Sequence, residues 1–237
     1  VRFDGQVVSD AGDRIVLAAS NNTSWGINDG SVSVEALNDD INRNTFSHTR
    51  VYDVSSGSHT FYAIAHNFVE TEGSGMASIY GSLTVEFVPE GNSLVGFQGI
   101  SQTDIDLSNQ TTIGEVTINP PLSGKAIVHF DGHTVSDVGD RIVLAASDTT
   151  TWGINDGSVS LEAATDDVNS NSFSHTRVYN VAAGSHTFYA VAQNYVETEG
   201  SGMGSIYGSL TVEFVPGSTS SISKNVFESK LKLYPNP

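Results

Sequence analysis

The chain has 237 residues, a formal net charge of −17 at pH 7 and no cysteine. The lack of cysteine excludes disulfides, thiolate metal sites and a cysteine nucleophile. An acidic chain repels the phosphate backbone of nucleic acids, and no apolar run reaches the roughly 20 residues that a membrane-spanning helix needs. We therefore expect no nucleic-acid partner and no transmembrane segment.

A segment of 89 residues occurs twice in the chain. Residues 1–89 align without a gap with residues 128–216, and the two copies differ at 20 positions. A match of this length indicates a tandem duplication, and we therefore predict two domains. The predicted bounds are a first repeat at 1–89, a linker at 90–110, a second repeat at 111–216 and a tail at 217–237.

Each copy consists of short segments with the patterns of β-strands. Asp13–Ser20 (DRIVLAAS) is a continuous apolar run of the length of a buried strand, whereas Ser31–Ala36 alternates between polar and apolar residues. The other segments that the first copy offers as strands are 46–54, 59–67 and 82–89. Ser55–Ser58 (SSGS) predicts a hairpin turn, with Gly57 supplying an unusual backbone angle.

No window shows the 3.6-residue period of a helix. The sequence therefore predicts an all-β fold: two tandem antiparallel β-sandwich or jelly-roll domains with an extended C-terminal tail. Residues 111–119 and 124–130 are also strand-like and are expected to belong to the second domain. Their counterpart would lie upstream of Val1, so we expect the first repeat to lack its opening strand and the chain to end a longer array.

The order of these strands resembles the C1q/TNF-like jelly roll of bacterial surface proteins. The resemblance rests on three segments of the second repeat: Gly124–Phe130 (GKAIVHF), Ser185–Val191 (SHTFYAV) and Gly208–Phe214 (GSLTVEF). It implies two tandem jelly rolls in which a late aromatic strand and a final strand fill the inner face. It brings no catalytic motif with it.

The tail joins a Ser/Gly-rich linker after Pro216 to the ending Leu233–Pro237 (LYPNP). This arrangement resembles the start of the C-terminal sorting domain of cargo of the bacterial type IX secretion system, although the remainder of that domain is missing from the sequence. The resemblance implies a protein that is secreted or held on the outer cell surface, with the type IX secretion machinery as a partner.

Each copy contains one acidic segment with the pattern D-x-N-x-N. Alternate oxygen-bearing side chains on a tight loop can face one Ca²⁺ ion. The candidate metal ligands are Asp39, Asp40, Asn42, Asn44, Asp166, Asp167, Asn169 and Asn171. Asp and Asn also favour turns because their side chains bind the local backbone, and this second interpretation stays open. The turn sequences Asp10–Asp13 and Asp137–Asp140 allow the same two interpretations.

Each copy also has a tryptophan followed by turn-forming polar residues. The indole ring can stack on a sugar while neighbouring amides and carboxylates bind its hydroxyl groups. The candidate ligand-binding residues are Trp25, Asn28, Asp29, Trp152, Asn155 and Asp156. A buried position in a sandwich core is the alternative for both tryptophans.

The sequence contains no catalytic motif that is specific enough to assign a reaction. Two carboxylate pairs, Glu70 with Glu72 and Glu197 with Glu199, precede Gly-Ser-Gly segments that indicate surface loops rather than a pocket floor. The histidines at 48, 59, 175 and 186 lack the spacing of zinc ligands. We therefore predict a protein without enzymatic activity.

The function that we favour from the sequence is a secreted, cell-surface structural or adhesive repeat protein that assembles into a filament or surface layer. Its expected partners are other copies of itself or cell-surface glycans. The alternative is a carbohydrate-binding appendage of a secreted polysaccharide-degrading enzyme. Calcium is the one cofactor that the residues indicate.

Overall fold

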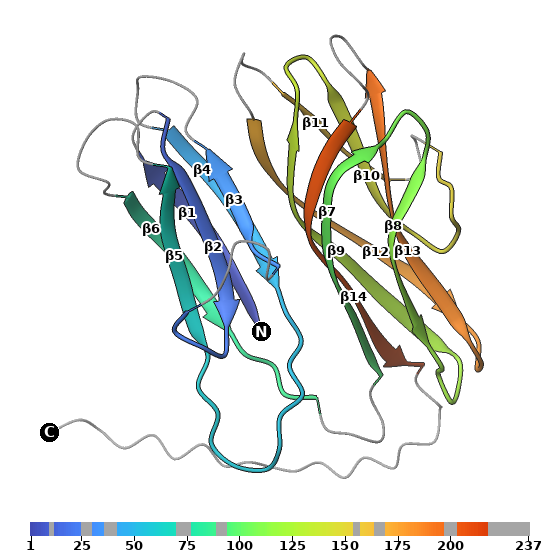
Figure 1. Cartoon of the computed structure of the whole chain (residues 1–237). Coiled ribbons are helices and arrows are strands. Elements are labelled where there is room, and N and C mark those ends of the chain that lie inside the picture. Colours follow the sequence, from blue (N-terminus) through green and yellow to red (C-terminus); the bar gives the residue numbers. More distant parts are fainter. Residues whose placement is uncertain are drawn as a thin grey trace, which may run out of the picture.

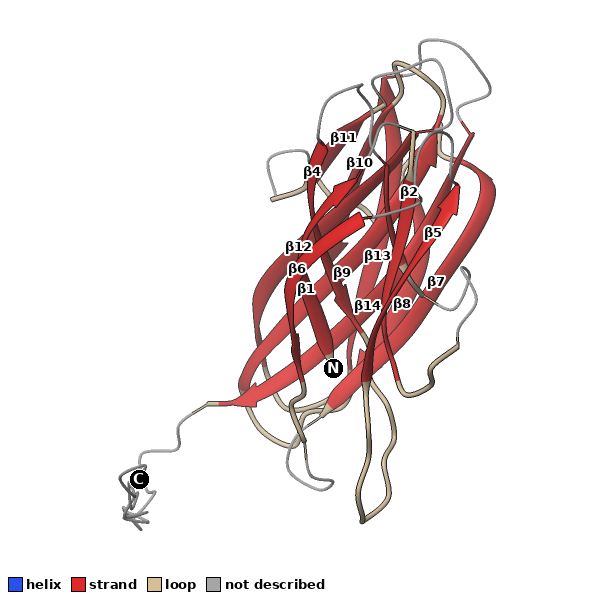
Figure 2. Cartoon of the chain, turned by 90° about the vertical axis from the view of Figure 1, so that its left-hand side faces the viewer, coloured by secondary structure: helices blue, strands red, loops and turns tan. Residues whose placement is uncertain are grey.

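The computed structural model describes residues 1–9, 12–24, 30–35, 42–69, 77–88, 94–153, 157–163, 169–196 and 203–217. Within these ranges every regular element is a β-strand, and no helix occurs (Figure 2). The strands pair in the antiparallel sense and form four sheets. The prediction of an all-β fold is therefore confirmed. The same ranges contain no helix long and apolar enough to cross a membrane.

The first copy folds into a sandwich of two three-stranded sheets. One sheet has the order β4-β1-β6 and the other has the order β3-β2-β5. The strands are β1 (Arg2–Ser9), β2 (Arg14–Ser20), β3 (Val32–Glu35), β4 (Asn42–Thr49), β5 (Tyr62–Val69) and β6 (Ala77–Thr84). The described core between the sheets includes Phe3, Val7, Ile15, Leu17 and Phe46.

The second copy folds in the same way but has one more strand in each sheet. The sheet orders are β12-β9-β14-β7 and β11-β10-β13-β8. The strands are β7 (Val95–Asp106), β8 (Thr111–Ile118), β9 (Gly124–Ser136), β10 (Arg141–Ser147), β11 (Val159–Glu162), β12 (Asn169–Val181), β13 (His186–Val196) and β14 (Met203–Pro216). Figure 1 shows the two sandwiches side by side.

The segment predicted as a linker, 90–110, contributes a strand to the second sandwich. β7 lies within it and pairs with β14 over ten residue pairs from Met203–Asp106 to Glu213–Val95. The physical reason for the difference is that Gly96, Gly99 and several polar residues interrupt the apolar pattern of β7. The second sandwich therefore begins before residue 111.

The predicted hairpin at Ser55–Ser58 is not a hairpin. The strand before it, β4, pairs with β1, whereas the strand after it, β5, pairs with β2 in the opposite sheet. The turn therefore crosses from one sheet to the other. Gly57 does have the expected unusual angle, with φ of 137°, and Gly184 at the corresponding place in the second copy has φ of 119°.

The apolar run that predicted a buried strand is buried on both of its faces. In β10, Ile142 and Leu144 lie in the core of the second sandwich. Val143 and Ala145 lie in a smaller cluster on the outer face of the same sheet. A strand covered on both faces needs no alternation of polar and apolar residues, which explains the continuous run.

Candidate functional site

The two sandwiches contact each other through different parts of their surfaces. Strands β3 and β4 of the first sandwich lie against the outer face of the sheet that contains β12, β9 and β14. We call the residues Ser31, Ser33, Glu35 and Thr49 the docking edge, and Asp131, His133, Ser170 and Ser209 the docking face. Together they form the junction.

Hydrogen bonds cross the junction from side chains of the second sandwich to backbone carbonyls of the first. They run from Ser209 Oγ to Thr49 O (2.8 Å), from Ser172 Oγ to Thr45 O (2.9 Å), from His133 Nδ1 to Ser31 O (3.1 Å) and from Ser170 Oγ to Ser33 O (3.4 Å). Because the acceptors are main-chain atoms of a sheet edge, the junction fixes the position of that edge and not only of side chains.

His133 lies at the centre of the docking face and is buried. Its ring stacks on Tyr207, with ring centroids 5.1 Å apart. Burial lowers the pKa of His133 to about 4, so the ring is neutral at physiological pH. Its partner, the Ser31 carbonyl, can only accept, so Nδ1 carries the proton.

Asp131, two residues before His133, is also buried. Its Oδ1 accepts a hydrogen bond of 2.5 Å from Ser174 Oγ, and Thr49 of the docking edge binds the same carboxylate. Burial raises the pKa of Asp131 because it removes the charged form from water. The junction therefore holds a titratable acid beside a neutral imidazole, both hydrogen-bonded to the other sandwich.

The effect of the junction is clearest at one ion pair that occurs in both copies. Arg14 and Glu35 form a salt bridge of 3.5 Å with side chains 18% and 16% exposed. The counterparts Arg141 and Glu162 lie 3.3 Å apart but are 42% and 63% exposed. Glu35 also accepts a hydrogen bond from the Ser170 backbone N–H across the junction, at 3.2 Å. The second sandwich thus covers this pair in the first copy only.

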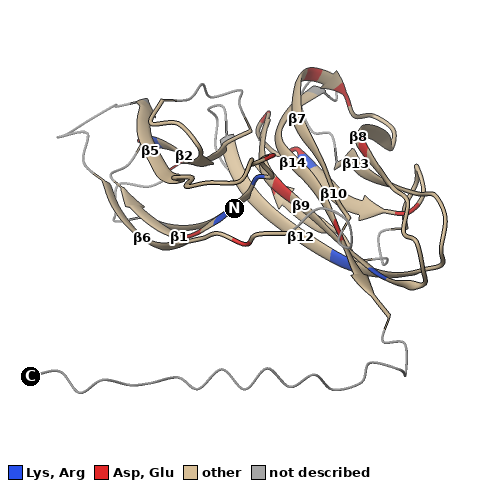
Figure 3. Ribbon diagram, turned by 90° about the horizontal axis from the view of Figure 1, so that it is seen from below, with Lys and Arg blue, Asp and Glu red and all other residues tan. Residues whose placement is uncertain are grey.

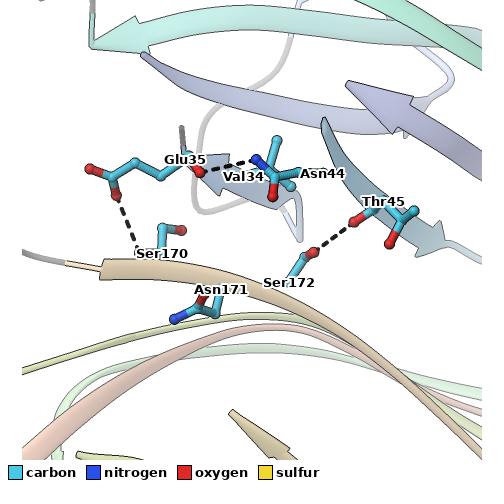
Figure 4. A pocket seen from close by; sticks show the side chains of 7 residues that line it. All are labelled: Val34, Glu35, Asn44, Thr45, Ser170, Asn171 and Ser172. Carbon is cyan, nitrogen blue, oxygen red and sulfur yellow. Dashed lines mark hydrogen bonds between the residues drawn. The ribbon is translucent and has the colours of Figure 1, made fainter. Parts of the chain in front are cut away.

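A hollow of about 260 Å³ opens beside the junction (Figure 4). Its lining residues are Val34, Glu35, Asn44, Thr45, Ser170, Asn171 and Ser172. Asn44 points into the first sandwich and donates from Nδ2 to the Glu35 carbonyl at 3.1 Å. Asn171 lies on the opposite side of β12 from Ser170 and Ser172, as alternation along a strand requires. The two asparagines therefore do not converge.

The predicted calcium loops are only partly within the described residues. Asp39, Asp40, Asp166 and Asp167 lie outside them. Asn42 and Asn44 belong to β4, and Asn169 and Asn171 belong to β12. Alternate residues of a strand lie about 6.6 Å apart, which is not the tight loop that the calcium interpretation assumes for these four residues. The described part of the chain contains no cluster of three or more His, Asp or Glu.

Another acidic position does stand out in both copies. Asp13 and its counterpart Asp140 are buried, and neither oxygen of Asp13 has a hydrogen-bond partner, nor does Oδ1 of Asp140. The amide atoms of Asn67 and Asn194 are likewise buried without partners. Asn67 pairs with the core residue Ile15, so its side chain lies on the core face of the sheet, and Asp13 directly precedes β2.

The predicted sugar-binding residues lie outside the described ranges, with the exception of Trp152. Trp152 is buried against Val143, Ala145 and Val191 on the outer face of the β10 sheet. Gln110 holds its backbone on both sides, accepting from Trp152 N at 2.8 Å and donating to Trp152 O at 2.7 Å. The Trp152 ring is therefore a packing group and is not available to stack on a sugar.

The four histidines considered as zinc ligands in the sequence form hydrogen bonds with backbone groups instead. His48 is buried, and its Nδ1 accepts from Ala19 N at 2.9 Å. His175 makes the equivalent bond with Ala146 N at 3.0 Å. His59 is exposed and His186 is partly exposed, and they bind the carbonyls of Ser55 and Ala182 near their own turns. The carboxylate pairs at 70–72 and 197–199 lie outside the described residues.

Sequence patterns did not identify the docking face. Its residues are polar, and they alternate with core residues along β9, β12 and β14. That pattern is the one expected of a sheet face in contact with water. One available signal was the difference between copies on β9 and β12, where His133 and Ser170 replace Gln6 and Arg43.

Comparisons with known proteins leave the chain without a family. No family model matches it, and no curated protein matches it. Among solved structures, that of infectious bursal disease virus Gt strain is 10% identical and has a TM-score of 0.30, with 89% of this chain and 56% of that chain covered. The crystal structure of the VP2 subviral particle of the same virus is 12% identical and has a TM-score of 0.30, with 89% of this chain and 55% of that chain covered.

The chain thus spans little more than half of each of these structures. At such TM-scores the likeness carries no argument about function.

Proposed function

We propose that the chain is a non-enzymatic structural or adhesive repeat protein of the cell exterior, in which each sandwich docks on the next. The observation that carries the proposal is the form of the junction. It joins an edge of one sandwich to a face of the other, and each surface has a sequence counterpart on the other sandwich. Such a contact is heterologous, and it can be repeated without closing on itself.

The second copy retains the docking edge. Its residues Ser158, Ser160, Glu162 and Thr176 are identical in type to Ser31, Ser33, Glu35 and Thr49. Ser33 is buried in the junction, whereas Ser160 is exposed. The carbonyl acceptors of the edge belong to the backbone and do not depend on side-chain identity.

The first copy retains two of the four docking-face residues, with Asp4 and Ser82 corresponding to Asp131 and Ser209. Gln6 replaces His133 with another hydrogen-bond donor, and Arg43 replaces Ser170. Ser82 is exposed, whereas Ser209 is buried and donates to Thr49. This surface can therefore accept the edge of a further unit through the same type of bond.

The place of action is proposed from the sequence. The resemblance of Leu233–Pro237 to a type IX sorting signal supports export and surface attachment. The acidic composition supports a solvated exterior position, and acidic residues lie on both sandwiches (Figure 3). Other copies of the chain are the partner that the junction supports.

Two substitutions test the assembly because each blocks one surface. Ser82→Arg fills the docking face of the first sandwich, and Ser160→Arg fills the docking edge of the second. Sedimentation velocity at high protein concentration should show end-to-end oligomers for the unaltered chain and monomers for each variant alone. An equimolar mixture should give dimers, because each variant retains the surface that the other lacks.

Ser55→Arg, on an exposed turn outside both surfaces, is the control and should assemble normally. A monomeric unaltered chain at all concentrations would overturn the proposal. So would a mixture of the two variants that forms no dimer.

Cation binding is a second candidate that one observation favours. A carboxylate buried without a partner is costly, and a bound cation removes that cost. Asp13 with Asn67, and Asp140 with Asn194, supply oxygen ligands of the type that Ca²⁺ takes.

A further inference from the structure

The two copies contain the same apolar residues on and just after β6 and in β14, but cover them differently. Ile79 of β6, and Val85 and Phe87 just after β6, correspond to Ile206, Val212 and Phe214 of β14. The exposed fractions are 37% for Ile79 and 0% for Ile206, 52% for Val85 and 0% for Val212, and 71% for Phe87 and 2% for Phe214. The same large apolar side chains are therefore core in one sandwich and surface in the other.

The difference has an identifiable cause in the second sandwich. There β7 pairs with β14 and β8 pairs with β13, so a two-stranded segment closes one side of both sheets (Figure 1). Its side chains Ile100, Ile113, Val116 and Ile118 lie in the same core cluster as Ile206, Val212 and Phe214. The first sandwich has no described strand on the corresponding side of β5 or β6.

The missing neighbours also shorten the strands. β14 continues to Pro216, whereas β6 ends at Thr84, although Val85–Val88 and Val212–Val215 are identical in sequence. β13 begins at His186, whereas β5 begins at Tyr62 rather than at the corresponding His59. In the second copy these extensions pair with β7, β8 and the start of β9. The sequence of the first copy is thus able to form longer strands when partners are present.

We propose that the open side of the first sandwich, formed by β5 and β6, is the binding site of a strand-turn-strand segment of the β7–β8 type, whose two strands join different sheets. The occupant resembles Leu94–Ile118 in sequence. Its apolar side chains cover Ile79, Val85 and Phe87, and its main-chain groups pair with the free edges of β5 and β6. This inference does not depend on the junction or on its proposed role in assembly.

In the second sandwich the β7–β8 segment precedes β9 in the same polypeptide, and five residues, 119–123, join β8 to β9. A connection this short places the segment on its own sandwich and keeps its local concentration high. The same connection in front of β1 would deliver a segment of this type to β5 and β6.

A graft tests the inference directly. Residues 94–127 are fused ahead of Val1, which is the counterpart of Val128, so that the first copy receives the segment that precedes the second. Hydrogen exchange is then measured on amides of 60–69 and 77–88. We expect protection in these segments to rise by at least roughly tenfold, with loss of binding of an apolar dye. The amides of β13 and β14 serve as the internal reference for correct folding.

The matched control carries Asp at the grafted counterparts of Ile100 and Val116. These changes leave the length and connection of the graft intact but place charges against the apolar strip. Protection by the first graft but not by the control supports the inference. Equal protection by both grafts, or by neither while the second sandwich remains folded, overturns it.

Delivery of the segment from in front of β1 is tested separately with the ungrafted chain. Exchange of β7–β8 between two molecules would also cover the open side, and it would appear as a dimer held by strand exchange. Such a dimer would overturn delivery from in front of β1. A monomer whose open side becomes protected only in the grafted chain supports it.

Discussion

His48 on β4 accepts a hydrogen bond from the backbone N–H of Ala19 on β2, and this bond joins the two sheets of the first sandwich across its core. The other ring nitrogen, Nε2, donates to the Gly30 carbonyl. Tyr52 adds a bond from its hydroxyl to the Ala19 carbonyl at 3.0 Å. One nitrogen accepts and the other donates, so the ring is held neutral.

This arrangement predicts a loss of stability in mild acid. Burial lowers the pKa of His48 to about 4, whereas the unfolded chain binds the proton near 6.5. The stabilisation is therefore complete above pH 6.5 and declines as the pH falls toward 4, by about 1.4 kcal/mol per pH unit for this histidine. His133, with a pKa also of about 4, adds a second contribution of the same sign.

Urea unfolding between pH 7.5 and 4.5 checks this prediction. His48→Gln should reduce the slope of stability against pH, and His59→Gln, at an exposed turn histidine, should leave it unchanged. An unaltered slope in His48→Gln would show that this histidine does not control the acid response.

The junction predicts a difference between two equivalent serines. Ser209→Ala removes the bond to the Thr49 carbonyl and leaves that part-buried acceptor without its side-chain donor, which should cost about 1–2 kcal/mol. Ser82→Ala, at the exposed counterpart, should change stability by less than about 0.5 kcal/mol. Chemical unfolding of both variants measures the difference, and equal effects would contradict the described junction.

The open side predicts a larger contrast between two phenylalanines. Phe214→Ala empties a buried position and should destabilise the protein by about 3–5 kcal/mol. Phe87→Ala changes a mostly exposed side chain and should have little effect in the chain as it stands. In the grafted chain the cost of Phe87→Ala should approach that of Phe214→Ala. Thermal unfolding with and without the graft gives all four values.

The buried aspartates predict a response to calcium. If a cation binds at Asp13 and Asp140, added Ca²⁺ should raise the unfolding temperature and EDTA should lower it. Asp140→Asn should reduce the shift, whereas Asp53→Asn, at an exposed loop residue, should not. Identical unfolding temperatures in Ca²⁺ and in EDTA would remove the basis for a cation at these positions.

The strands that sequence patterns located were those whose burial leaves a simple signature. β2 was visible because it is covered on both faces and its residues from Ile15 to Ala19 are all apolar. β7 was missed because glycines and polar residues break its pattern, although Ile100 lies in the core. The turn at Gly57 was recognised, but its partners were not, since a turn alone does not determine whether the chain returns to the same sheet.

The docking face could not be recognised from one sequence for a different reason. Asp131 and Ser209 have the composition of wetted sheet residues, and only the approach of the first sandwich buries them. The same chemistry at Asp4 and Ser82 is partly or fully open to solvent. Burial at these positions therefore depends on the contact with the other sandwich and not on the local sequence.

The edge-to-face form of the junction also gives direction to any row of units built through it. One terminus of such a row presents strand edges and the other presents a flat sheet, so the two ends are chemically distinct. Growth at each end would select a different incoming surface, and a molecule that halts one end would leave the other able to extend.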